Sequence, residues 1–122
     1  MEVEIGNGEL FDKVSILQIK QERGLPVEKE LDVLQNTIAG LLTETMQHPF
    51  NVLKQINREL WIIEDNKRAY EKTKNFDENF VALSRLVYLL NDERARVKRL
   101  IDNLTLSNIV EYKKHNGEQS ND

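Results

Sequence analysis

The sequence contains no cysteine and little glycine or proline, with five and two of these residues among 122. The absence of cysteine excludes disulfide frameworks, thiolate nucleophiles and zinc sites built on thiolates. The small share of glycine and proline disfavours a turn-rich all-β fold, a glycine-rich phosphate-binding loop and a proline-rich linker. A chain of this length and composition is typical of one domain that buries its own hydrophobic core.

The charge of the chain and its apolar runs limit the kinds of partner and cellular location that we expect. Seventeen Lys and Arg against 21 Asp and Glu give a formal net charge of −4, which disfavours a protein that coats nucleic acid. The chain begins Met-Glu-Val-Glu-Ile, without the basic residues of a secretion signal, and its longest apolar run extends only from Leu86 to Leu90. We therefore expect a cytoplasmic protein that does not enter a membrane.

Apolar residues recur at helical spacing over four segments, at about 8–23, 27–46, 51–74 and 78–104. Gly24 and Pro26 suit the end of the first helix and the start of the second, and Pro49 is expected to separate the second from the third. The pattern predicts an all-α fold, an antiparallel four-helix bundle made of two hairpins, of which the second is long and coiled-coil-like. The predicted domain spans residues 1–112, and the polar residues 113–122 are predicted to form a disordered tail.

The last two segments carry heptad-like seams that predict how they pair. Antiparallel pairing keeps the sum of the residue numbers in each layer at 153 or 154, from Leu53 with Ile101 to Tyr70 with Leu83. Agreement between two separate seams over six layers favours a long hairpin.

The first segment is apolar on two faces. Leu10, Val14 and Leu17 share one face, whereas Ile16 and Ile19 lie nearly opposite. Such a helix is either central in its bundle or shared with another subunit. We expect a homodimer in which the first helix takes part.

Two charged residues interrupt the seam of the second hairpin, Lys67 in the third segment and Arg94 in the fourth. A charge at a buried position must be paired, because otherwise its burial costs several kcal/mol. We expect Glu64 to pair with one of the two cations. The predicted polar layer consists of Glu64, Lys67, Asn91, Glu93 and Arg94. Such a layer either fixes the register of the helices or, as an alternative, forms an anion-binding pocket between them.

The sequence offers little for catalysis or for metal binding. Its two histidines stand apart, His48 at a predicted helix end and His115 in the predicted tail. Its four serines form no Ser-His-Asp arrangement. We therefore assign no catalytic, metal-binding or cofactor-binding residue and expect no cofactor.

One stretch of the sequence nevertheless resembles part of an enzyme family. FDKVSILQIKQER, residues 11–23, resembles the first helix of all-α chorismate mutases. The resemblance implies a mutase-like or lyase-like site in which Arg23, Lys67 and Arg94 bind carboxylates. The later segments do not match the active-site pattern of that family, so an enzyme stays the alternative interpretation.

Four longer pieces span nearly the whole chain, namely GELFDKVSILQIKQER, LWIIED, RLVYLLNDERARVKRLI and IVEYKK. In order and spacing they resemble a small family, a domain of unknown function of bacteria and tailed phages. The resemblance implies an all-helical intracellular protein and brings no catalytic residues. It adds secondary site candidates, which are Asp12, Lys20, Arg23, Trp61, Tyr88 and Asp92.

These observations favour a non-enzymatic structural or adaptor protein that acts by self-association, as a homodimer, and by binding an unidentified protein partner. A small-anion-binding protein or mutase-like enzyme with a site around Lys67 and Arg94 is the alternative. Weak association with nucleic acid is a second alternative.

Overall fold

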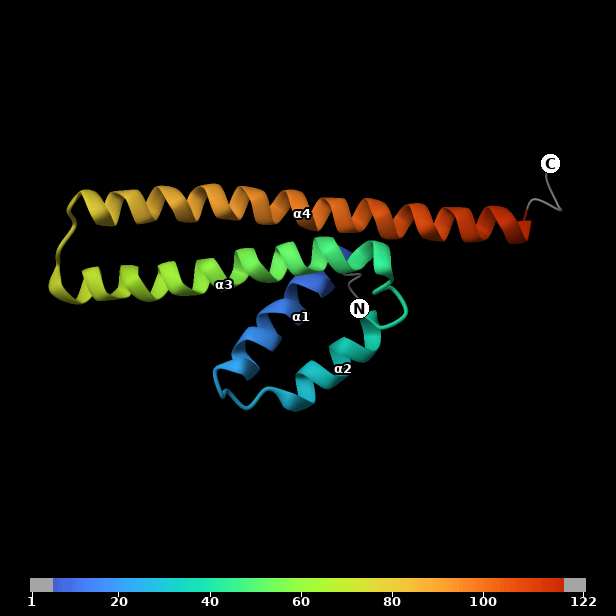
Figure 1. Cartoon of the computed structure of the whole chain (residues 1–122), viewed down its shortest axis with the longest axis horizontal. Helices are drawn as coiled ribbons and strands as arrows, with labels where there is room; N and C mark the ends of the chain where they lie inside the picture. The colour runs from blue at the N-terminus through green and yellow to red at the C-terminus, as the bar shows by residue number, and fades with distance from the viewer. Residues whose placement is uncertain (1–5, 118–122) are drawn as a thin grey trace, which may run out of the picture.

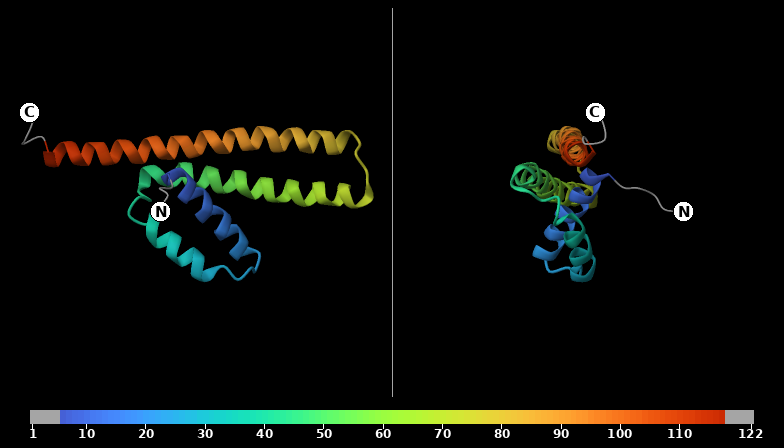
Figure 2. Two further views of the ribbon diagram at one scale, coloured as in Figure 1. Left: turned by 180° about the vertical axis from the view of Figure 1, so that it is seen from behind. Right: turned by 90° about the vertical axis from the view of Figure 1, so that its right-hand side faces the viewer.

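The computed structural model describes residues 6–117, and their side chains as far as residue 106. Its four helices are α1 (Asn7–Glu22), α2 (Glu28–Ile38), α3 (Glu44–Thr73) and α4 (Glu78–Gly117). The helices α3 and α4 form a long antiparallel hairpin, and the shorter hairpin of α1 and α2 crosses one end of it obliquely (Figures 1 and 2). The predicted all-α bundle of two hairpins is confirmed.

Helix α1 is central in this arrangement, since it is the one helix that approaches each of the other three among the described residues. The ring of Phe11 packs edge-to-face against Phe50 of α3, with 5.8 Å between the ring centroids. Ile19, on the second apolar face of α1, is also buried inside the chain. The central position therefore explains the burial of Ile19, whereas Ile16 on the same face is half-buried and lines a groove.

The backbones of α1 and α4 approach one another at Gly8. The backbone N–H of Gly8 donates to the carboxylate of Asp102 at 2.7 Å, where one of the unpaired N–H groups of the first helical turn meets a negative charge. A Cβ atom at Gly8 would lie 2.2 Å from the backbone oxygen of Lys98. Glycine is thus the residue that lets the two backbones touch, and the ion pair between Lys98 and Glu9 at 2.8 Å lies beside the contact.

The connection between α2 and α3 differs from the prediction. Helix α2 ends at Ile38 instead of near residue 46, and α3 begins at Glu44 after an extended Thr43. Pro49 lies inside α3, so the prediction that it separates two helices is wrong. In the second turn of a helix a proline removes one backbone hydrogen bond, and the buried ring of Pro49 packs inside the chain in return.

Helix α4 is longer than predicted. It runs to Gly117 instead of ending near residue 104, so residues 113–117 of the predicted tail are helical. The reason is the absence of a helix breaker, because the sequence has neither glycine nor proline between Phe76 and Gly117. Residues 118–122 lie outside the described part of the chain.

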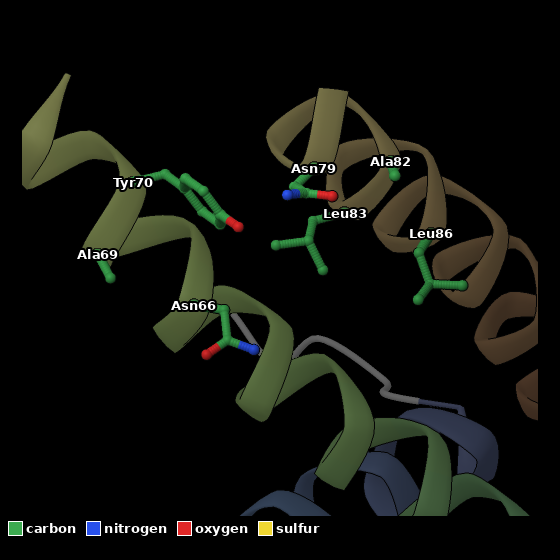
Figure 3. Close-up of a pocket in the computed structure, with 7 residues that line it drawn as sticks. All are labelled: Asn66, Ala69, Tyr70, Asn79, Ala82, Leu83 and Leu86. Atoms are coloured by element: carbon green, nitrogen blue, oxygen red, sulfur yellow. The ribbon is translucent and has the colours of Figure 1, made fainter. Parts of the chain in front are cut away.

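The α3–α4 hairpin closes through residues 74–77, where Lys74 adopts the left-handed conformation with φ 56° and ends α3. Next to this loop the ring of Tyr70 packs against Phe80, with centroids 6.2 Å apart. The predicted partner Leu83 faces Tyr70 across a hollow of about 630 Å³ between the helices (Figure 3). The aromatic contact lies about one helical turn nearer to the loop than this predicted pair.

Candidate functional site

A buried ion pair joins α1 to α4. The Nε and Nη2 atoms of Arg94 donate to the two carboxylate oxygens of Asp12 at 3.0 Å and 2.6 Å. The side chain of Asp12 is 2% exposed and that of Arg94 is 28% exposed. Two parallel charge-assisted hydrogen bonds make this one of the stronger arrangements between two side chains.

Helix α3 contributes to the same place through Asn57. Its Nδ2 atom donates to Oδ1 of Asp12 and to Oγ of Ser15, both at 2.8 Å, and the Ser15 hydroxyl donates to the backbone oxygen of Asp12 at 2.7 Å. We call Asp12, Ser15, Asn57 and Arg94 the central polar network. Among the described residues no buried side-chain nitrogen or oxygen lacks a hydrogen-bond partner, so the network is closed.

The network holds a permanent positive charge. Hydrogen bonds to Asp12 raise the pKa of Arg94 above its usual value, and they outweigh the opposite effect of partial burial. A guanidinium of this kind stays protonated at every pH at which proteins fold, so it cannot exchange a proton with a substrate. It can donate hydrogen bonds and bind or position a negative charge, which in this structure is the carboxylate of Asp12.

A groove of about 340 Å³ lies beside the network, between α1, α3 and α4. Its apolar wall comes from Ile16, Ile19, Leu60 and Trp61, and its polar side comes from Asn57, Glu64, Arg68 and Arg94. Both guanidinium groups already pair with carboxylates, Arg94 with Asp12 and Arg68 with Asp65. An anionic ligand in this groove would have to compete with these carboxylates.

Two secondary candidates meet at the outer end of α1. The guanidinium of Arg23 lies over the ring of Trp61, 4.9 Å from its centroid, and 3.9 Å from the carboxylate of Asp65. This cation–π contact ties the end of α1 to α3. It brings together residues that the family resemblance had singled out.

Glu22, one residue before Arg23, accepts from Lys54 at 2.9 Å and from Arg58 at 2.7 Å. These hydrogen bonds lower the pKa of the Glu22 carboxyl below its usual 4.5. A carboxyl whose pKa is lowered by folding stabilises the folded state at pH values above its unfolded pKa. This contribution is lost as the pH falls through the folded pKa. We expect Glu22→Gln to reduce the free energy of unfolding by less than about 1 kcal/mol near neutral pH, because the side chain is half-exposed.

Urea unfolding of both proteins checks this expectation. The difference between them should shrink as the pH falls from about 5 to about 2. A difference that stays constant over this range would contradict the assigned role of the Lys54 and Arg58 hydrogen bonds.

The structure brings together only part of the predicted polar layer. Arg94 is at the centre, and its Nη1 lies 3.5 Å from Oδ1 of Asn91. The expected pairing of Glu64 with Lys67 or Arg94 is wrong: Arg94 pairs with Asp12, and the Nζ of Lys67 lies 5.6 Å from the ring centroid of Phe80. The reason is that α1 inserts an acidic residue closer to Arg94 than the α3 carboxylate can come.

The other predicted residues lie apart from the network. Glu93 pairs with Arg96 on the surface of α4 at 2.6 Å. Lys20 is half-buried on α1, whereas Tyr88 and Asp92 are exposed on α4. These positions do not form one site with Arg94.

Sequence reasoning missed Ser15 and Asn57. A signal for Asn57 was present, since it stands at core spacing between Leu53 and Leu60 of α3. A polar residue at such a position requires a partner when it is buried. The partner could not be named without knowing where α1 crosses the hairpin.

Within the part of the chain that the structure describes, no group of three or more His, Asp or Glu side chains is placed to hold a metal ion. Over residues 6–117 no helix combines the length and the apolar character needed to cross a membrane.

Comparison with known proteins adds one relationship. No curated protein and no solved structure matches the chain. A family model does match, over residues 1–122, and the chain belongs to this family of unknown function (DUF6165).

Proposed function

We propose that this protein is a non-enzymatic structural or adaptor protein that acts by self-association and protein binding. The observation that carries the proposal is that part of the α3–α4 hairpin projects beyond α1 and α2 (Figure 1) and exposes apolar side chains there. Its exposed large apolar side chains are Phe76, Val81, Leu86, Tyr88 and Leu89. Val81, Tyr88 and Leu89 line one hollow of α4, whereas Leu86 lines the hollow between α3 and α4. Exposed apolar side chains that gather as the first three do are typical of a protein–protein contact.

The central polar network supports the non-enzymatic part of the proposal. Its hydrogen-bonding groups are used in joining α1, α3 and α4 to one another, as in polar layers that fix the arrangement of helices. The cation that the sequence offered for binding an anion, Arg94, is held by Asp12. The second predicted cation, Lys67, lies against Phe80 and not beside Arg94.

The expected setting of this role is the cytoplasm of bacteria or of cells infected by a phage. Self-association gives a homodimer as the simplest form. The protein partner is a further binding component, and the projecting hairpin is the part of the chain best placed to reach it.

Molar mass in solution tests the proposal. We expect light scattering coupled to size-exclusion chromatography to show a mass twice that of the 14.3 kDa chain, rising from a monomer as the concentration increases. A monomer from low micromolar to near-millimolar concentration would rule out self-association. A thermal-shift screen with phosphate, nucleotides and dicarboxylates tests the alternative, and a shift with any of them would favour an anion-binding role.

A further inference from the structure

One stripe of α4 combines exposed apolar side chains with exposed charges. Val81, Tyr88 and Leu89 are 53%, 68% and 60% exposed, and with Arg85 they line a shallow hollow of about 520 Å³. Their spacing of seven or eight residues places them on one side of the helix. This side lies away from the buried positions Val97 and Ile101, so no other described helix covers it.

Charged residues alternate in sign along the same stripe. Glu78, Arg85, Asp92 and Arg99 follow one another at intervals of seven residues, and all four are exposed. None of the four forms an ion pair with another described residue. We call this stripe, from Glu78 to Arg99, the outer face of α4.

Because of the order of its charges, the outer face is complementary to the same face of a second copy when the two helices run antiparallel. When a second copy of the helix runs antiparallel and is centred between Tyr88 and Leu89, Arg85 faces Asp92 of that copy. In the same register Glu78 faces Arg99, and each contact occurs twice because of the two-fold symmetry. A parallel arrangement in register would instead place Arg85 against Arg85, which opposes association.

We infer that a second copy of this chain docks antiparallel along the outer face of α4, with the two-fold axis between Tyr88 and Leu89. The two apolar residues of each copy meet at the centre, and Val81 lies against the aliphatic stem of Arg96 of the second copy. The contact is about 33 Å long, because the stripe covers six turns of helix. This inference rests on the proposed self-association and adds the surface and the geometry to it.

Reversal of two charges tests the geometry. Arg85→Asp alone and Asp92→Arg alone each place like charges opposite one another, twice per dimer. We expect each variant to raise the dimer dissociation constant about a hundredfold. Their equimolar mixture restores opposite charges at both contacts, so it should form a heterodimer with nearly wild-type affinity. The double variant Arg85→Asp/Asp92→Arg should form a homodimer for the same reason.

Lys29→Asp is the matched control for Arg85→Asp, since it makes the same change of charge on an exposed site of α2. Sedimentation velocity measures the association of all variants, and circular dichroism checks that each is folded. A wild-type protein that stays monomeric contradicts the proposed self-association and the inference together. A dimer that resists both single reversals, or two folded monomeric variants that do not associate when mixed, overturns only the antiparallel geometry.

Discussion

Arg94→Met is expected to lower the free energy of unfolding by about 3–5 kcal/mol, because it leaves a buried carboxylate without its cation. Asp12 is almost completely buried, and Asn57 alone cannot replace the two hydrogen bonds that Arg94 donates to it. The expected loss is therefore due more to the stranded charge of Asp12 than to the intrinsic strength of the pair. Urea denaturation followed by circular dichroism measures it.

Two further variants separate this explanation from a general effect of substitution. Asp12→Leu/Arg94→Met removes both charges and should recover most of the stability that Arg94→Met loses, since a buried ion pair can be exchanged for apolar side chains at little cost. Arg68→Met is the matched control on α3, where the pair with Asp65 is exposed and contributes about 1 kcal/mol or less. If Arg94→Met were no worse than Arg68→Met, the central polar network would not be what holds α1 in place.

Gly8→Ala is expected to cost about 3 kcal/mol, as a single methyl group forces two helix backbones apart. The added Cβ would lie 2.2 Å from the backbone oxygen of Lys98 and 2.9 Å from its carbonyl carbon. A backbone cannot turn aside as the end of a flexible side chain can, so the cost lies toward the upper end for overpacking. Separation of the helices also lengthens the hydrogen bond from Gly8 to Asp102.

Gly40→Ala provides the control for this prediction. A Cβ atom at Gly40 meets nothing within 4 Å, so the same substitution there should leave the stability unchanged or slightly higher. Thermal unfolding of both variants next to the wild-type protein measures the contrast. Equal melting temperatures for the two variants would mean that α1 and α4 can separate without cost at Gly8.

The long hairpin was predictable because its signal is periodic. Leu53, Ile56, Leu60 and Ile63 repeat along α3 and are all buried in the structure. The start of α3 was not predictable in the same way, since the rule that Pro49 ends a helix was outweighed by the burial of its ring. The ring contact between Tyr70 and Phe80 was not predicted, because it depends on how the turn closes.

The candidate site was predictable in part for a related reason. Arg94 stood out as a charge on an apolar seam, and this is a property of one helix alone. Its partner depended on where α1 crosses the hairpin, which the spacing within any one segment does not encode. Within the hairpin, Glu64 was the expected partner of Arg94. The actual partner, Asp12, lies on another helix and 82 residues earlier in the chain.

This separation in sequence has a consequence for the order in which the chain folds. The hairpin of α3 and α4 can form by local closure of a short loop, whereas the contacts of α1 with α4 join residues 82 to 94 positions apart. Long-range contacts of this kind form late, because closing so large a loop of chain costs entropy before the contacts stabilise it. During synthesis α1 can pack against α2 and α3 as soon as these helices emerge, so we expect only its contacts with α4 to wait until residues 94–102 have left the ribosome.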